Sequence, residues 1–505
     1  MWLELVPARL LGWQHDLRHH QRPSGVLRAV SKATDSALKI GARSALLLRS
    51  WERWVRFVPA LLLVGVAAHQ VFLANTAGLS PWSGGGFGMF STTDAGSSRH
   101  LHALVIRPGI QREVRIPEAM KDRAQRVATF PSDANLRAFA LVLADLPTPD
   151  HGPATSVRIQ VWHTEFDPIS LAPIGRILRS LEVSVQERGP FGARDAASES
   201  KGFAGRAAMS RFENAARSLR QIDSVDLALR LTLLDLLLRP IGEWQIRPAI
   251  LALAGAGLLI PGWLRRPQLW FALAGLTALR FWTDWPLADN HAYLISYWCL
   301  ALGISLVVRD TEACLALNGR LLIGLAFAFA VLWKGVLSPD FINGTFLRVT
   351  MLQDPRFEDW TLLSTGLSAD QLEIQHAALD RHLDSPPLEV EPAPALSARF
   401  SWIADATTYW TAAIELALAA AFLWWKGGVL SRARHALLIV FCATTYAVAT
   451  VEGFGWLLIS MGVAQCDPRL VKTRALYIAS FALILVYREV PWARLLADAI
   501  GAAGP

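Results

Sequence analysis

Two apolar runs with polar residues at their ends decide how this chain folds. Residues 281–303 read FWTDWPLADNHAYLISYWCLALG, and residues 324–346 read GLAFAFAVLWKGVLSPDFINGTF. The first run contains Asp289 and His291, and the second contains Lys334. Because an ionisable side chain is costly inside a bilayer, such residues at the ends of apolar segments suggest a functional site. The rest of the sequence decides whether the two polar clusters meet.

The composition is that of a membrane protein. Hydrophobic residues make up 53% of the 505 residues, and charged residues make up only 18%, whereas about 25% is usual in soluble domains. The chain also has 20 tryptophans, a residue that concentrates at membrane–water interfaces. We interpret the net charge of +7 as a topology signal rather than as affinity for nucleic acid.

Eight apolar runs predict transmembrane helices, since each approaches the length of about 17–25 residues that crosses a bilayer. The predicted fold is therefore an all-α polytopic membrane bundle of about eight helices with an inserted small α+β extramembrane domain. The predicted spans are 55–74, 247–264, 268–284, 291–308, 320–337, 407–426, 436–464 and 472–488.

The distribution of basic residues predicts the orientation. Arg and Lys outnumber Asp and Glu in residues 1–54, which places this segment in the cytoplasm by the positive-inside rule. The first apolar run lacks a cleavage site and is interpreted as a signal anchor. The expected location is the bacterial inner membrane, with several passes. One loop does not follow the positive-inside rule: residues 465–471 and their flank carry Arg469, Lys472 and Arg474 on the predicted outer side.

The regions outside the predicted spans suggest one folded domain and one loop. The alternation in SVRIQVWHTEF at 156–166 and in three similar stretches is typical of β-strands, and residues 133–146 and 203–238 have helical patterns. The predicted domain boundaries are 1–54 for the basic segment, 76–240 for an outer-face α+β domain, 245–490 for the bundle with a loop at 338–405, and 491–505 for a cytoplasmic tail.

The predicted topology places His291 and Lys334 at one depth on the outer side. A Lys in an apolar pocket has a lowered pKa and can act as a base; the alternatives are a Lys that extends toward water and a His that caps a helix. Glu452, inside the seventh predicted span, is either a buried acid or an interfacial residue. The candidate catalytic residues are Lys334, His291, Glu452, Asp289 and Asp340.

A glycine-rich segment, SGGGFGMF at 83–90, follows the first span. It lacks the strand and helix that flank a phosphate-binding loop. We predict a tight loop with Trp82, Phe87 and Phe90 as membrane-interface aromatics, and a binding role is the alternative. The histidines lack the spacing of metal ligands, so no metal site is predicted.

Three short motifs resemble the HTTM superfamily, the membrane domain shared by vitamin K-dependent γ-glutamyl carboxylase and many bacterial proteins. They are Asp289–Leu294, then Ala330–Lys334 with Ser338–Gly344, and Glu452–Trp456. The resemblance covers about residues 245–490. It implies an outward-facing site, Lys334 as the base that deprotonates a quinol, and a lipid-soluble quinone or quinol as cofactor. The second Asn-His motif and the large lumenal domain of the carboxylase have no counterpart here, so carboxylation of glutamate is not implied.

Two functions remain open at this point. The first is an outward-facing membrane enzyme that acts on a peptide or lipid-soluble substrate with Lys334 as base. The second is a non-catalytic membrane subunit or scaffold that binds a protein partner through its outer domain. Membrane lipids are expected partners in both cases, and nucleic acid in neither.

Overall fold

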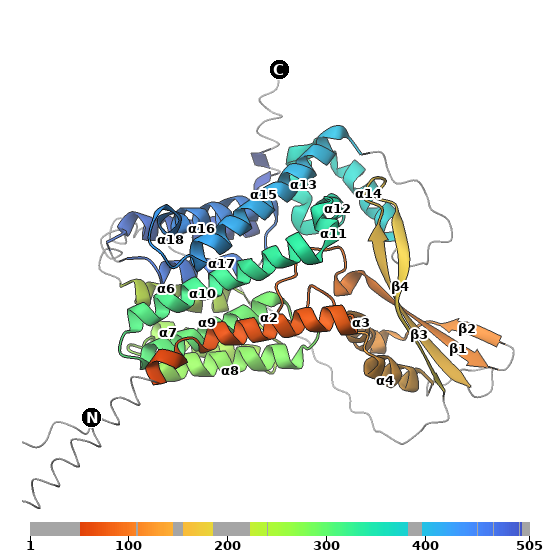
Figure 1. The fold of residues 1–505 in the computed structure, drawn as a ribbon, viewed down its shortest axis with the longest axis horizontal. Helices are drawn as coiled ribbons and strands as arrows, with labels where there is room; N and C mark the ends of the chain where they lie inside the picture. Colours follow the sequence, from red (N-terminus) through yellow and green to blue (C-terminus); the bar gives the residue numbers. More distant parts are fainter. Residues whose placement is uncertain are drawn as a thin grey trace, which may run out of the picture. The chain divides into compact units, whose positions relative to one another are not determined.

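The computed structural model describes residues 51–107, 110–144, 155–184, 223–239, 241–381, 396–451, 453–467, 469–493 and 495–496. The predictions for residues 1–50 and for Glu452 lie outside these residues. All that follows concerns the residues from Arg56 on, which form one compact unit. That unit is mostly helical and contains one small antiparallel sheet (Figure 1).

The predicted α+β region contains a four-stranded antiparallel sheet with strand order β2-β1-β3-β4. Alternate residues of β3 (Val157, Ile159 and Val161) are almost fully buried, and they form one hydrophobic core with Phe139 and its neighbours on α4. The predicted strands are therefore confirmed. The elements are η1 (Gly96–Ser98), β1 (Arg99–Arg107), β2 (Ile110–Val114), η2 (Glu118–Met120), α3 (Lys121–Thr129), α4 (Asp133–Ala144), β3 (Ser156–Phe166) and β4 (Pro173–Ser184).

The remaining helices belong to the bundle or to a group of short helices after Lys334. They are α2 (Val58–Ala77), α6 (Ser224–Leu238), α7 (Arg247–Leu259), α8 (Pro267–Thr283), α9 (Asn290–Val307), α10 (Thr311–Leu332), η3 (Trp333–Leu337), α11 (Pro339–Ile342), α12 (Thr345–Gln353), η4 (Pro355–Phe357), α13 (Glu358–Thr365), α14 (Ala369–Arg381), α15 (Ala398–Leu423), α16 (Val429–Val448), α17 (Phe454–Val463) and α18 (Val471–Glu489).

Four helices of the described chain are long and apolar enough to cross a membrane. These four are α2, α9, α15, and α10 together with its continuation to Leu337. α7 and α17 are apolar but shorter. A multi-pass membrane protein is thus supported, with fewer helices of spanning length than the eight predicted. α9 is buried along nearly its whole length, so it forms the centre of the bundle.

The predicted span 436–464 is wrong as a single helix, because the chain breaks between Val448 and Phe454. Gly453, just before α17, has φ +78°, a left-handed conformation that a continuous helix does not contain. α16 and α18 run parallel, since His435 near the start of α16 lies 2.9 Å from the Tyr477 hydroxyl near the start of α18, and their far ends line one groove. α17, which connects them, therefore runs back through the bundle.

This reversal moves the 465–471 loop to the opposite end of the bundle from the one predicted. The Cys466 carbonyl accepts a hydrogen bond from Ser224, the first residue of α6. The next residues of α6 include Asp226, which pairs with Arg265 in the α7–α8 connection. Arg469 thus lies at the same end as Arg265; we call this the basic end. The same geometry places the end of α18 at the other end, which differs from the cytoplasmic tail predicted at 491–505.

α6 was predicted as part of a helix in the outer domain, and the structure places it in the bundle. Ten of its 15 residues are buried, and its leucines belong to the same hydrophobic cluster as those of α9 and α17. The part of the predicted helix before Asp223 lies outside the described residues.

Arg99 joins the sheet to the first membrane-length helix. Its side chain is 1% exposed and makes a bidentate pair with Asp94, at 2.6 and 2.7 Å. The same guanidinium donates to the carbonyls of Gly78, at the end of α2, and of Ala128 and Thr129, at the end of α3. One buried cation thus holds three chain segments together.

We expect Arg99→Met to lower the free energy of unfolding by about 3–5 kcal/mol, because it leaves Asp94 without its partner and three carbonyls without a donor. Thermal unfolding in detergent measures this. Arg158→Met is the matched control: its partner is Glu182 and both side chains are partly exposed, so its loss should stay below about 1 kcal/mol. Equal losses in the two variants would contradict the role given to Arg99.

Candidate functional site

Lys334 lies where α10 widens. The helix ends in a π-helical turn over Trp333–Leu337, and the chain then bends at Pro339, which starts α11. A π turn holds one more residue than an α turn, so it changes which side chains face inward, and such turns are frequent at functional sites. Here the turn directs Lys334 into the protein, where the residue is 4% exposed.

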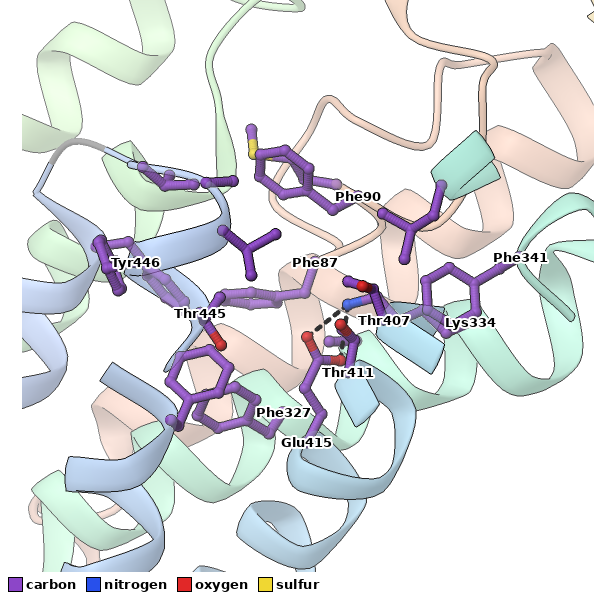
Figure 2. Close-up of a pocket in the computed structure, with 18 of the residues that line it drawn as sticks. Phe87, Phe90, Phe327, Lys334, Phe341, Thr407, Thr411, Glu415, Thr445 and Tyr446 are labelled. Carbon is purple, nitrogen blue, oxygen red and sulfur yellow. Dashed lines mark hydrogen bonds and ion pairs between the residues drawn. The ribbon is translucent and has the colours of Figure 1, made fainter. Parts of the chain in front are cut away.

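Glu415 of α15 is the partner of Lys334. Its two carboxylate oxygens accept hydrogen bonds from Lys334 Nζ at 2.5 and 2.7 Å (Figure 2). The Phe341 ring lies 5.5 Å from the same nitrogen, within the range of a cation–π contact. Both charged side chains are at least nine-tenths buried. Removing two charges from water is costly, so this pair needs a reason beyond stability.

The pair forms one side of an apolar pocket between α10, α15 and α16 (Figure 2). Thr407 and Thr411 lie on α15 beside Glu415, and Thr445 and Tyr446 come from α16. His291 and Asn290, at the start of α9, also line the pocket. Aromatic residues make up much of the remaining wall: Phe87, Phe90, Phe327, Phe341, Phe346, Phe357, Trp410, Phe441 and Phe454.

The glycine-rich segment forms part of this wall. Phe87 and Phe90 line the pocket, so the binding role that was the alternative prediction for this segment is the one that their positions favour. Both have positive φ, 60° and 58°, a conformation that is strained for an aromatic residue. The Phe87 N–H donates to Asn290 Oδ1 at 3.1 Å, which ties the loop to the start of α9. Gly86 packs directly on Gln70 of α2, where a Cβ would clash.

Asp289 and His291 lie together at the beginning of α9. Asp289 is the N-cap of the helix and accepts a hydrogen bond from the Ala292 N–H at 2.8 Å. Its carboxylate lies 3.8 Å from His291 Nδ1, and the His291 ring packs on Phe454 with centroids 4.9 Å apart. Burial opposes ionisation of Asp289, but His291 and the Ala292 N–H outweigh it and lower the pKa of that carboxyl below its usual value.

The structure brings together only part of the predicted set. His291 and Lys334 line one pocket, as the topology argument predicted, and Asp289 contacts His291 from outside it. Asp340 instead accepts hydrogen bonds from Thr92 and Thr93, at 2.7–3.1 Å. It anchors the chain after the glycine-rich loop next to the Lys334 turn, which is a positioning role.

Glu415 and the aromatic wall were not among the predicted site residues, although Glu415 is an acid within the sixth predicted span. Glu415 lies in the middle of a predicted span, and an acid in that position was itself a signal for a buried basic partner. Among the described residues, no cluster of three His, Cys, Asp or Glu side chains could hold a metal ion. No protein-family model, curated protein or solved structure matches the chain.

Proposed function

We propose that this chain is a polytopic membrane protein of the HTTM type and an enzyme whose pocket faces the outer side of a bacterial inner membrane. Helices α2, α7 to α10, α15, α16 and α18 would be the eight spans. α6 and α17 would be further helices buried among them, with α17 returning part of the way. The basic end of the bundle supports this orientation. It now includes the 465–471 loop, so Arg469 and Lys472 no longer oppose the positive-inside rule.

The Lys334–Glu415 pair would be the proton acceptor. Lys334 would be the base once one of its own protons has passed to Glu415, whose oxygens accept its hydrogen bonds, so the two groups would act as one unit. The unit is neutral before it takes a proton from a substrate hydroxyl, and it carries one positive charge afterwards. That charge then lies beside the substrate anion, where a medium of low dielectric makes the attraction strong. The main support for this proposal is the buried Lys334–Glu415 pair in the pocket wall.

The apolar, aromatic lining of the pocket supports a lipid-soluble ring compound as ligand, such as the quinone or quinol that the HTTM resemblance would imply. Phe87, Phe90 and Phe327 would hold the ring by aromatic packing, and Lys334 and Glu415 would face its polar edge. A bound quinol supplies a hydroxyl proton, and it gives up two electrons when it is itself oxidised. The chain's own contribution is to exclude water, to orient the hydroxyl and to hold its proton.

The proposal predicts that a bound quinol is ionised near neutral pH. We expect the purified protein to give the absorption spectrum of the naphthohydroquinone anion when a short-chain naphthohydroquinone is added under anaerobic conditions. Lys334→Gln should bind the compound without ionising it, because it removes the base. Lys426→Gln, at an exposed lysine just after α15, should behave as the wild type does. A wild type that neither binds nor ionises the compound would favour the scaffold alternative.

A further inference from the structure

Trp410 of α15 lies both on the pocket wall and on the surface of the bundle. It lines the pocket, yet it is 43% exposed. Glu415 is five residues further along the same helix, and Thr411, between them, also lines the pocket. The indole ring therefore belongs both to the pocket wall and to the surface of the bundle.

The surface around Trp410 is suited to lipid. α15 is one of the four membrane-length apolar helices, and the neighbouring Tyr409 is 71% exposed. Leu416 on α15 and Val440 on α16 are also exposed. In a protein that crosses a membrane, apolar side chains in such positions face acyl chains.

The seam between α15 and α16 is weakly held at this point. The one hydrogen bond of the Trp410 indole, from Nε1 to Thr444 Oγ1 of α16, is 3.3 Å long. The opposite wall is much more firmly held: Asn290 accepts a hydrogen bond from Phe87, Ser91 accepts one from Ser338, and Gly88 packs on the Trp333 ring. Of these two walls, the one at Trp410 is therefore the easier to open.

We propose that Trp410 is a lateral gate through which a lipid-soluble ligand passes from the bilayer, between α15 and α16, into the pocket. Breaking the bond to Thr444 and rotating the indole opens the seam beside Glu415 without disturbing the ion pair. Gates of this kind control access to many enclosed sites. The inference rests on the proposed function only in assuming that the bundle spans a membrane and that the pocket takes an apolar ligand.

A thiol in the pocket tests the gate without any knowledge of the ligand. Ala330 lines the pocket one turn before Lys334, and a thiol there would gain reactivity from the nearby ammonium group. The four native cysteines are buried. The wild-type chain, which lacks Ala330→Cys, measures the background labelling of these cysteines. The protein is placed in phosphatidylcholine vesicles, and the labelling rate is measured with lipid-soluble N-phenylmaleimide and with a charged, water-soluble maleimide.

We expect Ala330→Cys to react with N-phenylmaleimide and hardly at all with the charged reagent. Adding Trp410→Ala should speed the first reaction about tenfold or more, because it removes both the hydrogen bond and the ring packing. Adding Trp402→Ala, at an exposed tryptophan of the same helix that does not line the pocket, should leave the rate unchanged. Equal rates for the two alanine variants, or fast labelling by the charged reagent, would overturn the gate. Since no quinol is used, failure of the proposed chemistry is a separate result.

Discussion

Lys334→Met alone and Glu415→Leu alone should each lower the free energy of unfolding by about 3–5 kcal/mol, because each leaves the other charge buried without a partner. The double variant Lys334→Met/Glu415→Leu should regain most of that loss, since apolar residues of similar volume often replace a buried ion pair at no cost. Thermal unfolding in detergent gives these values. The double variant should nevertheless fail to ionise a bound naphthohydroquinone.

The value of the double variant is that it separates folding from chemistry. A single substitution at Lys334 confounds them, because the variant would lose both stability and the proton acceptor. A folded double variant that still ionises the quinol would show that the pair is only structural. The control is Arg348→Met/Asp405→Leu, which removes a more exposed pair between α12 and the same helix α15. It should cost about 1 kcal/mol or less in total and leave ionisation of the quinol unchanged.

The placement of His291 and Lys334 at the same pocket could be predicted because it depends only on the number of membrane spans between them. Consecutive membrane-length helices alternate in direction, so the start of α9 and the end of α10 must lie at one end of the bundle. The reversal at Gly453 was not predicted, although Glu452, Gly453 and Gly455 interrupt the apolar residues of 436–464. A second signal was that Arg469 and Lys472 lay on the wrong side of the predicted topology, which was evidence of a missing turn.

The partner of Lys334 was hidden for a different reason. Glu415 is 81 residues away in the sequence, and no local pattern encodes a contact at that distance. What the sequence does contain is an energetic requirement, since an acid and a base in separate apolar runs are each too costly to bury alone. The positions of Phe87 and Phe90 also depend on long-range contacts, here of the glycine-rich loop with Gln70 and Trp333.

Gly88→Ala should damage the pocket from a distance. A Cβ at this position would lie 2.5 Å from the Pro81 carbonyl oxygen and 2.9 Å from the Trp333 ring. The carbonyl belongs to the backbone and cannot rotate away, so the loop itself must move. We expect a loss of about 1–3 kcal/mol in the free energy of unfolding, as for other overpacked sites. We also expect roughly tenfold weaker binding of the naphthohydroquinone, because Phe87 and Phe90 shift with the loop.

Gly335→Ala is the matched control for this prediction. Gly335 lies in the π turn beside Trp333, but a Cβ there would meet no atom within 4 Å, so stability should change by less than about 1 kcal/mol and binding should be retained. Binding is measured by titration of the naphthohydroquinone against the intrinsic fluorescence of each variant. If Gly88→Ala binds as tightly as Gly335→Ala, the loop is not part of the binding wall. If both variants bind weakly, it is the π turn, rather than the loop that packs on it, that sets the shape of the pocket.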